Sequence, residues 1–149
     1  MSQDVFKGVI YIKFEDRDGP NPILHVPSDL SHDIVKKVNK RCLNLIKGNE
    51  IQPDSLESVS LEIDDLMGFM IYREWEMKEF YGGVLKTVLI LFLEQQDGTL
   101  LEHESSFRPA FEEYGKRLIE LEKSEAEKSE YLELLRKFKE KANLILADL

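Results

Sequence analysis

The sequence predicts an α/β fold of the α+β type, a five-stranded antiparallel sheet with one helix on one face and two C-terminal helices on the other. Two observations predict it. Apolar residues recur with strand and helix periodicity in the order ββαβββαα. The first and fifth strands are apolar on both faces, as central strands are, so the expected strand order is 2-1-5-4-3. Residues 1–149 are expected to form a single domain.

The first strand is expected over residues 5–14. Phe6 and Ile10 have the same parity in it and are therefore expected on the same face of the sheet. Residues 15–22 contain Gly and Pro and predict a polar turn, which leaves residues 23–26 as a very short second strand. Such a short strand is typical of a sheet edge.

The first helix is expected over residues 30–47, where apolar residues step by three and four to form one stripe. Gly48 is well placed as the C′ residue that ends this helix. The remaining helix surface carries a basic patch, which is either a solvated face or a site for an acidic partner or lipid head groups. The patch consists of Lys36, Lys37, Lys40 and Arg41.

The third strand is expected over residues 58–63, where polar and apolar side chains alternate. This alternation and the acidity of the segment are typical of a half-exposed edge strand. A turn over residues 64–68 leads to the fourth strand, residues 69–77, and the most apolar strand follows over residues 84–94. The polar face of the third strand consists of Ser58, Ser60 and Glu62.

The fourth strand places Arg73 and Trp75 on one face. A Trp beside charged residues can anchor an interface, or it can pack beneath a C-terminal helix. Two such helices are expected, over residues 106–123 and 125–149. The last has a wide apolar face, which predicts either docking on the sheet or contact with a partner helix.

The composition argues against several classes of function. A net charge of −9 without a dense basic block makes nucleic acid an unexpected partner. The single cysteine, Cys42, rules out an internal disulfide and a Cys-rich metal site, and it fits the reducing cytoplasm. The sequence shows neither a targeting segment nor an apolar run long enough for a transmembrane helix.

The chemistry-bearing residues form no recognisable set. His25, His32 and His103 fall in different elements and lack the spacing of a zinc site. Neither a phosphate-binding glycine loop nor a nucleophile elbow is present. The chain is therefore expected not to be an enzyme, and no cofactor or metal is expected.

The order of elements resembles that of longin-like domains, within the longin/roadblock group of profilin-like folds. Residues 8–14 (GVIYIKF) and the acidic turn that follows at residues 16–23 look like the first hairpin of these proteins. Roadblock domains begin with a helix, whereas this chain begins with a strand, so longin is the closer match. The resemblance covers nearly the whole chain, and the long, charged final helix departs from a minimal longin domain.

The resemblance implies a non-catalytic adaptor or scaffold that forms a homodimer or heterodimer. It also implies partners among small Ras-like GTPases or membrane-trafficking complexes, with peripheral membrane association as an option. The third strand and the first helix are the expected dimer surface, since an edge strand has unpaired backbone groups. Two alternatives remain: a small-molecule sensor of the PAS or GAF type, and a profilin-like cytoskeletal binding protein.

Overall fold

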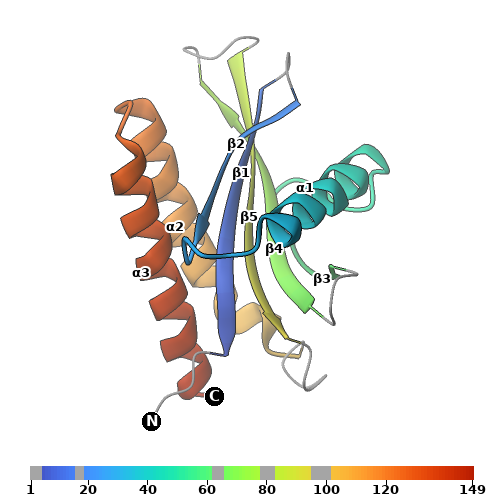
Figure 1. Ribbon diagram of the computed structural model, residues 1–149, viewed down its shortest axis with the longest axis vertical. Coiled ribbons are helices and arrows are strands. Elements are labelled where there is room, and N and C mark those ends of the chain that lie inside the picture. Colours follow the sequence, from blue (N-terminus) through green and yellow to red (C-terminus); the bar gives the residue numbers. More distant parts are fainter. Residues whose placement is uncertain (1–4, 16–18, 62–65, 78–82, 95–101) are drawn as a thin grey trace.

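The computed structural model describes residues 5–15, 19–61, 66–77, 83–94 and 102–149, and Figure 1 shows three layers. Helix α1 covers one face of the sheet, and α2 and α3 cover the other (Figure 1). This arrangement confirms the expected fold class and element order. The elements are β1 (Phe6–Glu15), β2 (Gly19–Val26), α1 (His32–Lys47), β3 (Leu56–Ser60), β4 (Leu66–Glu76), β5 (Val84–Glu94), α2 (Glu104–Lys123) and α3 (Lys128–Ala147).

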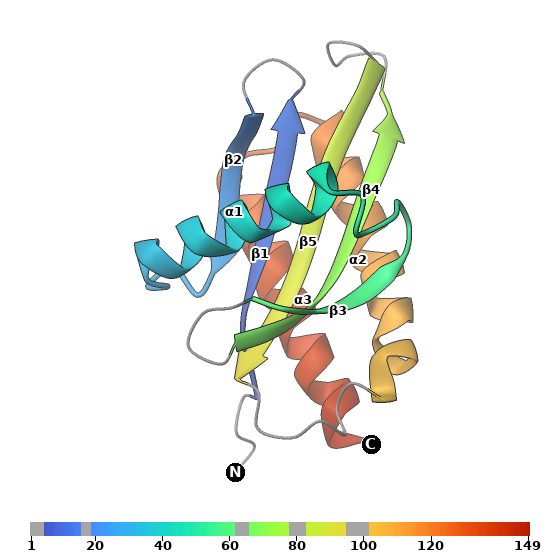
Figure 2. The ribbon, with the colours of Figure 1, turned by 90° about the vertical axis from the view of Figure 1, so that its right-hand side faces the viewer.

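The sheet has the order β2-β1-β5-β4-β3 with antiparallel neighbours throughout, as expected. Of the two doubly apolar strands, β5 is the central strand of the sheet and β1 lies beside it, where helices cover both faces. Helix α1 runs across the strands rather than along them (Figure 2). Strands β2 and β3 form the two edges, so each of them has a neighbouring strand of this sheet on one side only.

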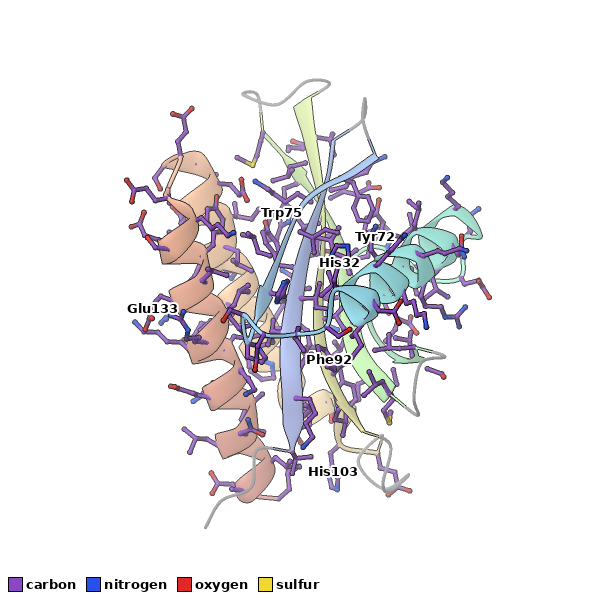
Figure 3. All side chains as sticks on the ribbon, in the orientation of Figure 1. His32, Tyr72, Trp75, Phe92, His103 and Glu133 are labelled. Carbon is purple, nitrogen blue, oxygen red and sulfur yellow. The ribbon has the colours of Figure 1, made fainter. Side chains whose placement is uncertain are left out.

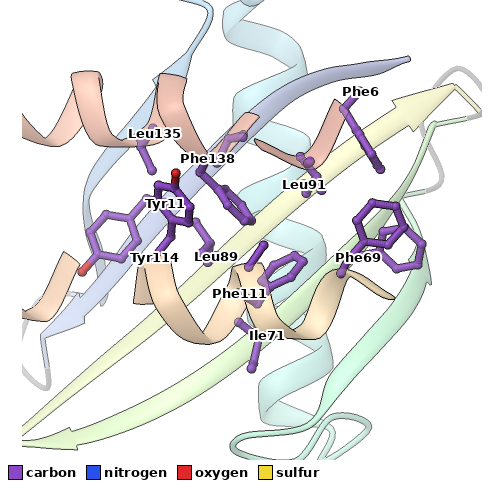
Figure 4. Close-up of a cluster of buried hydrophobic side chains, with 14 of the residues drawn as sticks. Phe6, Tyr11, Phe69, Ile71, Leu89, Leu91, Phe111, Tyr114, Leu135 and Phe138 are labelled. Carbon is purple, nitrogen blue, oxygen red and sulfur yellow. The ribbon is translucent and has the colours of Figure 1, made fainter. Parts of the chain in front are cut away.

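Two cores lie on the two faces of the sheet. On one face, Ile10 and Ile12 of β1 pack with Val38 and Leu45 of α1. On the other, β1, β4 and β5 pack with α2 and α3 through a cluster rich in aromatic rings, shown in Figure 4. Helix α3 therefore docks on its own sheet, which decides between the two arrangements that its wide apolar face allowed.

The expected position of Phe6 is wrong. A register shift between Phe6 and Gly8 interrupts the pairing of β1 with β5, so Lys7 is an extra residue. Phe6 therefore packs among the α2–α3 aromatics, its ring centroid 5.3 Å from that of Phe107, while Ile10 faces α1. A β-bulge reverses the alternation on one side of it, and the residue pattern does not show where that occurs.

Three strands begin earlier than expected. Strand β2 begins at Gly19, so residues 19–22 belong to a strand and not to a turn. Its prolines are tolerated because an edge strand needs only half of its backbone donors for the sheet. Strand β3 begins two residues early, at Leu56, and β4 begins at Leu66, which places Gly68 inside a strand opposite Val59.

The end of α1 also differs by one residue from the expectation. Gly48 has a φ of −82°, and the following Asn49 takes the left-handed conformation at a φ of 54°. Asn tolerates that region better than most residues with a side chain. Asn49 therefore occupies the C′ position, and Gly48 is the C-cap residue.

Candidate functional site

The outer side of β3 carries backbone groups that do not pair with β4. The Leu61 N–H donates to the Leu66 carbonyl at 3.0 Å, so these two residues form a hydrogen-bonded pair with β4. Antiparallel ladders alternate between inward and outward backbone groups. The N–H and C=O groups of Leu56, Ser58 and Ser60 therefore point away from β4, toward the open edge.

Helix α1 reaches this edge at Arg41 and is strongly basic. It carries five Lys or Arg residues against one acidic residue, Asp33, in a chain of net charge −9. Lys36, Lys37 and Lys40 are exposed, and Lys37 pairs with Asp33 at 3.0 Å. Arg41 is half-buried, and its Nε donates to the Ser60 carbonyl at 3.2 Å. Arg41 thus links the basic helix to the edge strand, and the two elements together are called the β3–α1 surface.

Of the three residues predicted on the polar face of β3, two lie in the described part of the chain. Ser58 lies on the α2 side, where its hydroxyl donates to Oε2 of Glu104 at 3.1 Å. Ser60 is exposed. Glu62, with the turn that follows it, lies outside the described residues.

Arg73 and Trp75 do not belong to the β3–α1 surface. They face α2, on the opposite side of the sheet from α1, as Figure 3 shows for Trp75 relative to Tyr72. Arg73 is only 6% exposed and pairs with Oε1 of Glu112 on α2 at 2.7 Å. Trp75 packs against Ile119 of α2 and donates from its ring N–H to Thr87. Both residues contact α2 and hold it against the sheet. For Trp75 this is packing beneath a C-terminal helix, the alternative to anchoring an interface.

A buried polar cluster, which the sequence did not single out, lies on the same side of the sheet. Glu122 of α2 accepts from the Tyr11 hydroxyl at 3.2 Å and pairs with the Lys13 ammonium at 3.1 Å. Burial, and then the negative charge of Glu122, raise the pKa of Tyr11 well above its ordinary value. The one available signal was Lys13, a charged residue in line with the apolar Val9 and Tyr11 of β1, and it does not identify a partner more than a hundred residues away.

The cysteine and the histidines do not form a cluster with one another. Cys42 is fully buried on α1, and burial raises the pKa of its thiol to about 12, so at neutral pH it is a protonated core residue. His32 and His103 are exposed at the starts of different helices (Figure 3), and His25 lies in β2. Within the residues described, no three His, Cys, Asp or Glu side chains are grouped so that they could hold a metal ion.

Two spaces among the described residues differ in volume and in their exposure to solvent. A cavity between the sheet and α2, beside Arg73 and Thr87, measures about 10 Å³. Small-molecule pockets usually enclose roughly 300–1,000 Å³. A larger space of about 510 Å³ lies between α2 and α3 and opens to solvent, with Leu121 and Leu134 among charged side chains.

No helix in the described part of the chain is both long and apolar enough to cross a bilayer. No model of a known protein family matches the sequence, and no match was found among the curated proteins.

Proposed function

We propose that this chain is a non-catalytic, longin-like adaptor that holds another protein at its β3–α1 surface. The observation that carries the proposal is the contact between Arg41 and the Ser60 carbonyl, which joins an open strand edge to a basic helix. Such an edge binds by adding a strand, and the charges beside it select the partner. The resemblance to longin-like domains supports a small Ras-like GTPase or a trafficking complex as the partner, and the cytoplasm as the location.

The close packing of α1 and α2 on the sheet, in the part of the chain that the structure describes, favours an adaptor over the small-molecule sensor. A sensor of the PAS or GAF type needs an enclosed volume between sheet and helix, whereas the cavity beside α2 has room for about one water molecule. On the α1 side, Val38 and Cys42 are fully buried against the sheet. In the described residues, no observation specifically supports the profilin-like alternative.

The GTPase part of the proposal is tested by charge reversal on α1. Purified small Ras-like GTPases, loaded with GDP or with a non-hydrolysable GTP analogue, are passed over the immobilised chain in a biosensor. We expect binding that depends on the nucleotide. Replacing Lys36, Lys37 and Lys40 with Glu should weaken it at least about tenfold, because these charges meet the partner directly.

The matched control makes the same charge change on the other side of the molecule. Lys116, Lys123 and Lys141 are exposed on α2 and α3, and their replacement with Glu should leave the affinity within about twofold, since charges beyond a Debye length are screened. Binding that is independent of nucleotide, or that both triple variants weaken equally, would remove the GTPase from the proposal.

Replacing Ser60 with Pro tests the strand edge itself. The Ser60 N–H points away from β4, so proline removes an outward donor and leaves the β3–β4 ladder intact. Any complex that continues the sheet across β3 should weaken at least about tenfold, whether the other chain is a second copy or a different protein. Sedimentation measures the first case and the biosensor the second.

Ser60→Ala is the control for the edge, because it keeps the backbone donor and removes only the hydroxyl. It should bind like the wild type. If Ser60→Pro binds as tightly as Ser60→Ala while both unfold at the same temperature, partners do not bind by pairing with β3.

A further inference from the structure

We propose that the outer face of α3 binds a second copy of this chain in antiparallel orientation. The inference goes beyond the proposed function and does not depend on it. It starts from five residues of α3 that recur at spacings of three and four, so they share one side of the helix. This α3 face consists of Glu130, Glu133, Leu134, Lys137 and Lys141.

The α3 face lies on an accessible part of the molecule. Its four charged residues are exposed, and Figure 3 shows Glu133 on the side of α3 that points away from the sheet. Leu134 is half-buried, and with Leu121 of α2 it lines the space of about 510 Å³ that opens to solvent between the two helices. The face therefore combines an apolar centre with charges around it.

The charge of the α3 face changes sign along the helix. Glu130 and Glu133, nearest the start of α3, are acidic, whereas Lys137 and Lys141 further along are basic. Leu134 lies between the two groups. A binding partner therefore needs a basic group opposite the first turns of α3 and an acidic group opposite the later ones.

The contacts that the two glutamates already make leave them able to bind across an interface. Glu133 pairs with Arg136 at 2.9 Å, and both side chains are more than half exposed. Such an exposed pair contributes at most about 1 kcal/mol, so it exchanges easily for another. Oε2 of Glu130 accepts from the Glu127 N–H at 3.0 Å, and a carboxylate has capacity for further donors.

A twofold axis level with Leu135 matches this charge order to itself. Glu133 and Lys137 each lie two residues from Leu135, about 3 Å along the helix in opposite directions. An antiparallel second copy therefore places its Lys137 beside Glu133, and its Lys141 beside Glu130. Because a twofold contact repeats every pair, four pairs of opposite charge form.

The apolar part of the face falls at the same axis. Leu134 is one residue from Leu135, so the Leu134 side chains of the two copies would meet at the centre of the contact. The space beside Leu121 is then filled by side chains of the second copy. Two parallel copies would instead bring like charges together along the whole face, which weakens association.

A dimer of this kind keeps the β3–α1 surfaces apart. Helix α1 covers the opposite face of the sheet from α3 (Figure 1), so the two copies would touch through α3 while their α1 helices face outward. Each dimer would then carry two β3–α1 surfaces. A partner that presents two matching sites would bind both, and the second binding event would gain from the high local concentration.

The test measures self-association of the full chain by sedimentation equilibrium over a concentration series. The wild type should fit a monomer–dimer equilibrium that weakens at high salt. Lys137→Glu and Glu133→Lys each turn two pairs of opposite charge into pairs of like charge, so each variant should weaken the dimer at least about tenfold. Both residues are exposed, and thermal unfolding checks that both variants fold.

Mixing the two variants separates a direct charge pair from a general effect of charge. In a mixed dimer the Glu at each of positions 133 and 137 of one copy meets a Lys of the other, so an equal mixture should regain most of the wild-type affinity. The double variant Glu133→Lys with Lys137→Glu should regain it alone. Lys40→Glu, the control, reverses an exposed charge on α1 and should dimerise like the wild type.

A wild type that stays monomeric at every concentration would overturn the proposal, and so would a mixture no more dimeric than either variant alone. A dimer that Ser60→Pro abolishes and Lys137→Glu leaves intact would assign self-association to the β3 edge and also overturn it. None of these results affects the binding of a GTPase to the β3–α1 surface, which is measured separately.

Discussion

Replacing Phe138 with Ala is expected to lower the free energy of unfolding by about 4 kcal/mol, as measured by chemical denaturation. Phe138 is 1% exposed and lies where α3 meets both α2 and the sheet. Its ring centroid is 5.0 Å from that of Phe111 and 5.3 Å from that of Tyr114 (Figure 4). Truncation removes both aromatic contacts and leaves a cavity that the surrounding rings fill only in part.

Leu144 on the same helix is the matched control. It is 64% exposed, so Leu144→Ala should change the free energy of unfolding by less than about 0.5 kcal/mol. A similar small change for Phe138→Ala would mean that α3 does not depend on the sheet for its position. The wide apolar face of the final helix would then be held by a partner.

Replacing Gly8 with Ala is expected to cost about 3 kcal/mol, at the upper end for overpacking a core. A Cβ at this position would lie 2.6 Å from Cζ of Phe92 and 2.8 Å from the carbonyl oxygen of Val26. The second neighbour is backbone, so it cannot move aside without disturbing the pairing of β1 with β2. Urea denaturation measures the loss, which should appear as a lower midpoint at an unchanged slope.

Gly48→Ala is the control for the loss of a glycine, because its backbone is in an ordinary region and its nearest neighbour would be 3.2 Å away at the end of a helix. It should cost less than about 1 kcal/mol. Phe92→Leu in the Gly8→Ala background should recover part of the stability, since it removes the ring that the new methyl meets. Equal costs for the two glycine variants would contradict the close approach at Gly8.

Much of the fold follows from periodicity alone. The doubly apolar strands became the centre of the sheet, and the alternating third strand became an edge, because burial on two faces and on one leave different patterns. Cys42 stands on the apolar stripe of α1 and is buried there, since a helix hides one face at a fixed spacing. Periodicity failed at Phe6, where a bulge resets the alternation.

The sequence predicted the candidate site only in part. The exposed lysines of α1 and the edge position of Ser60 were predictable, because a helix surface and an outer strand are defined by pattern. The burial of Arg73 was not predictable, because the exposure of an Arg on a strand depends on whether a partner for its charge lies nearby. Here that partner is Glu112, on a helix that the sequence reaches only much later. The role of Glu62 remains a prediction.

The sequence by itself determined the elements, their order in the sheet and the basic character of the first helix, since these depend on local spacing and composition. Only the tertiary structure decided which polar groups meet. The contact of Arg41 with the Ser60 carbonyl, like that of Glu122 with Lys13, joins residues from separate elements. Such pairs depend on how helices lie across the sheet, and periodicity carries no information about that angle.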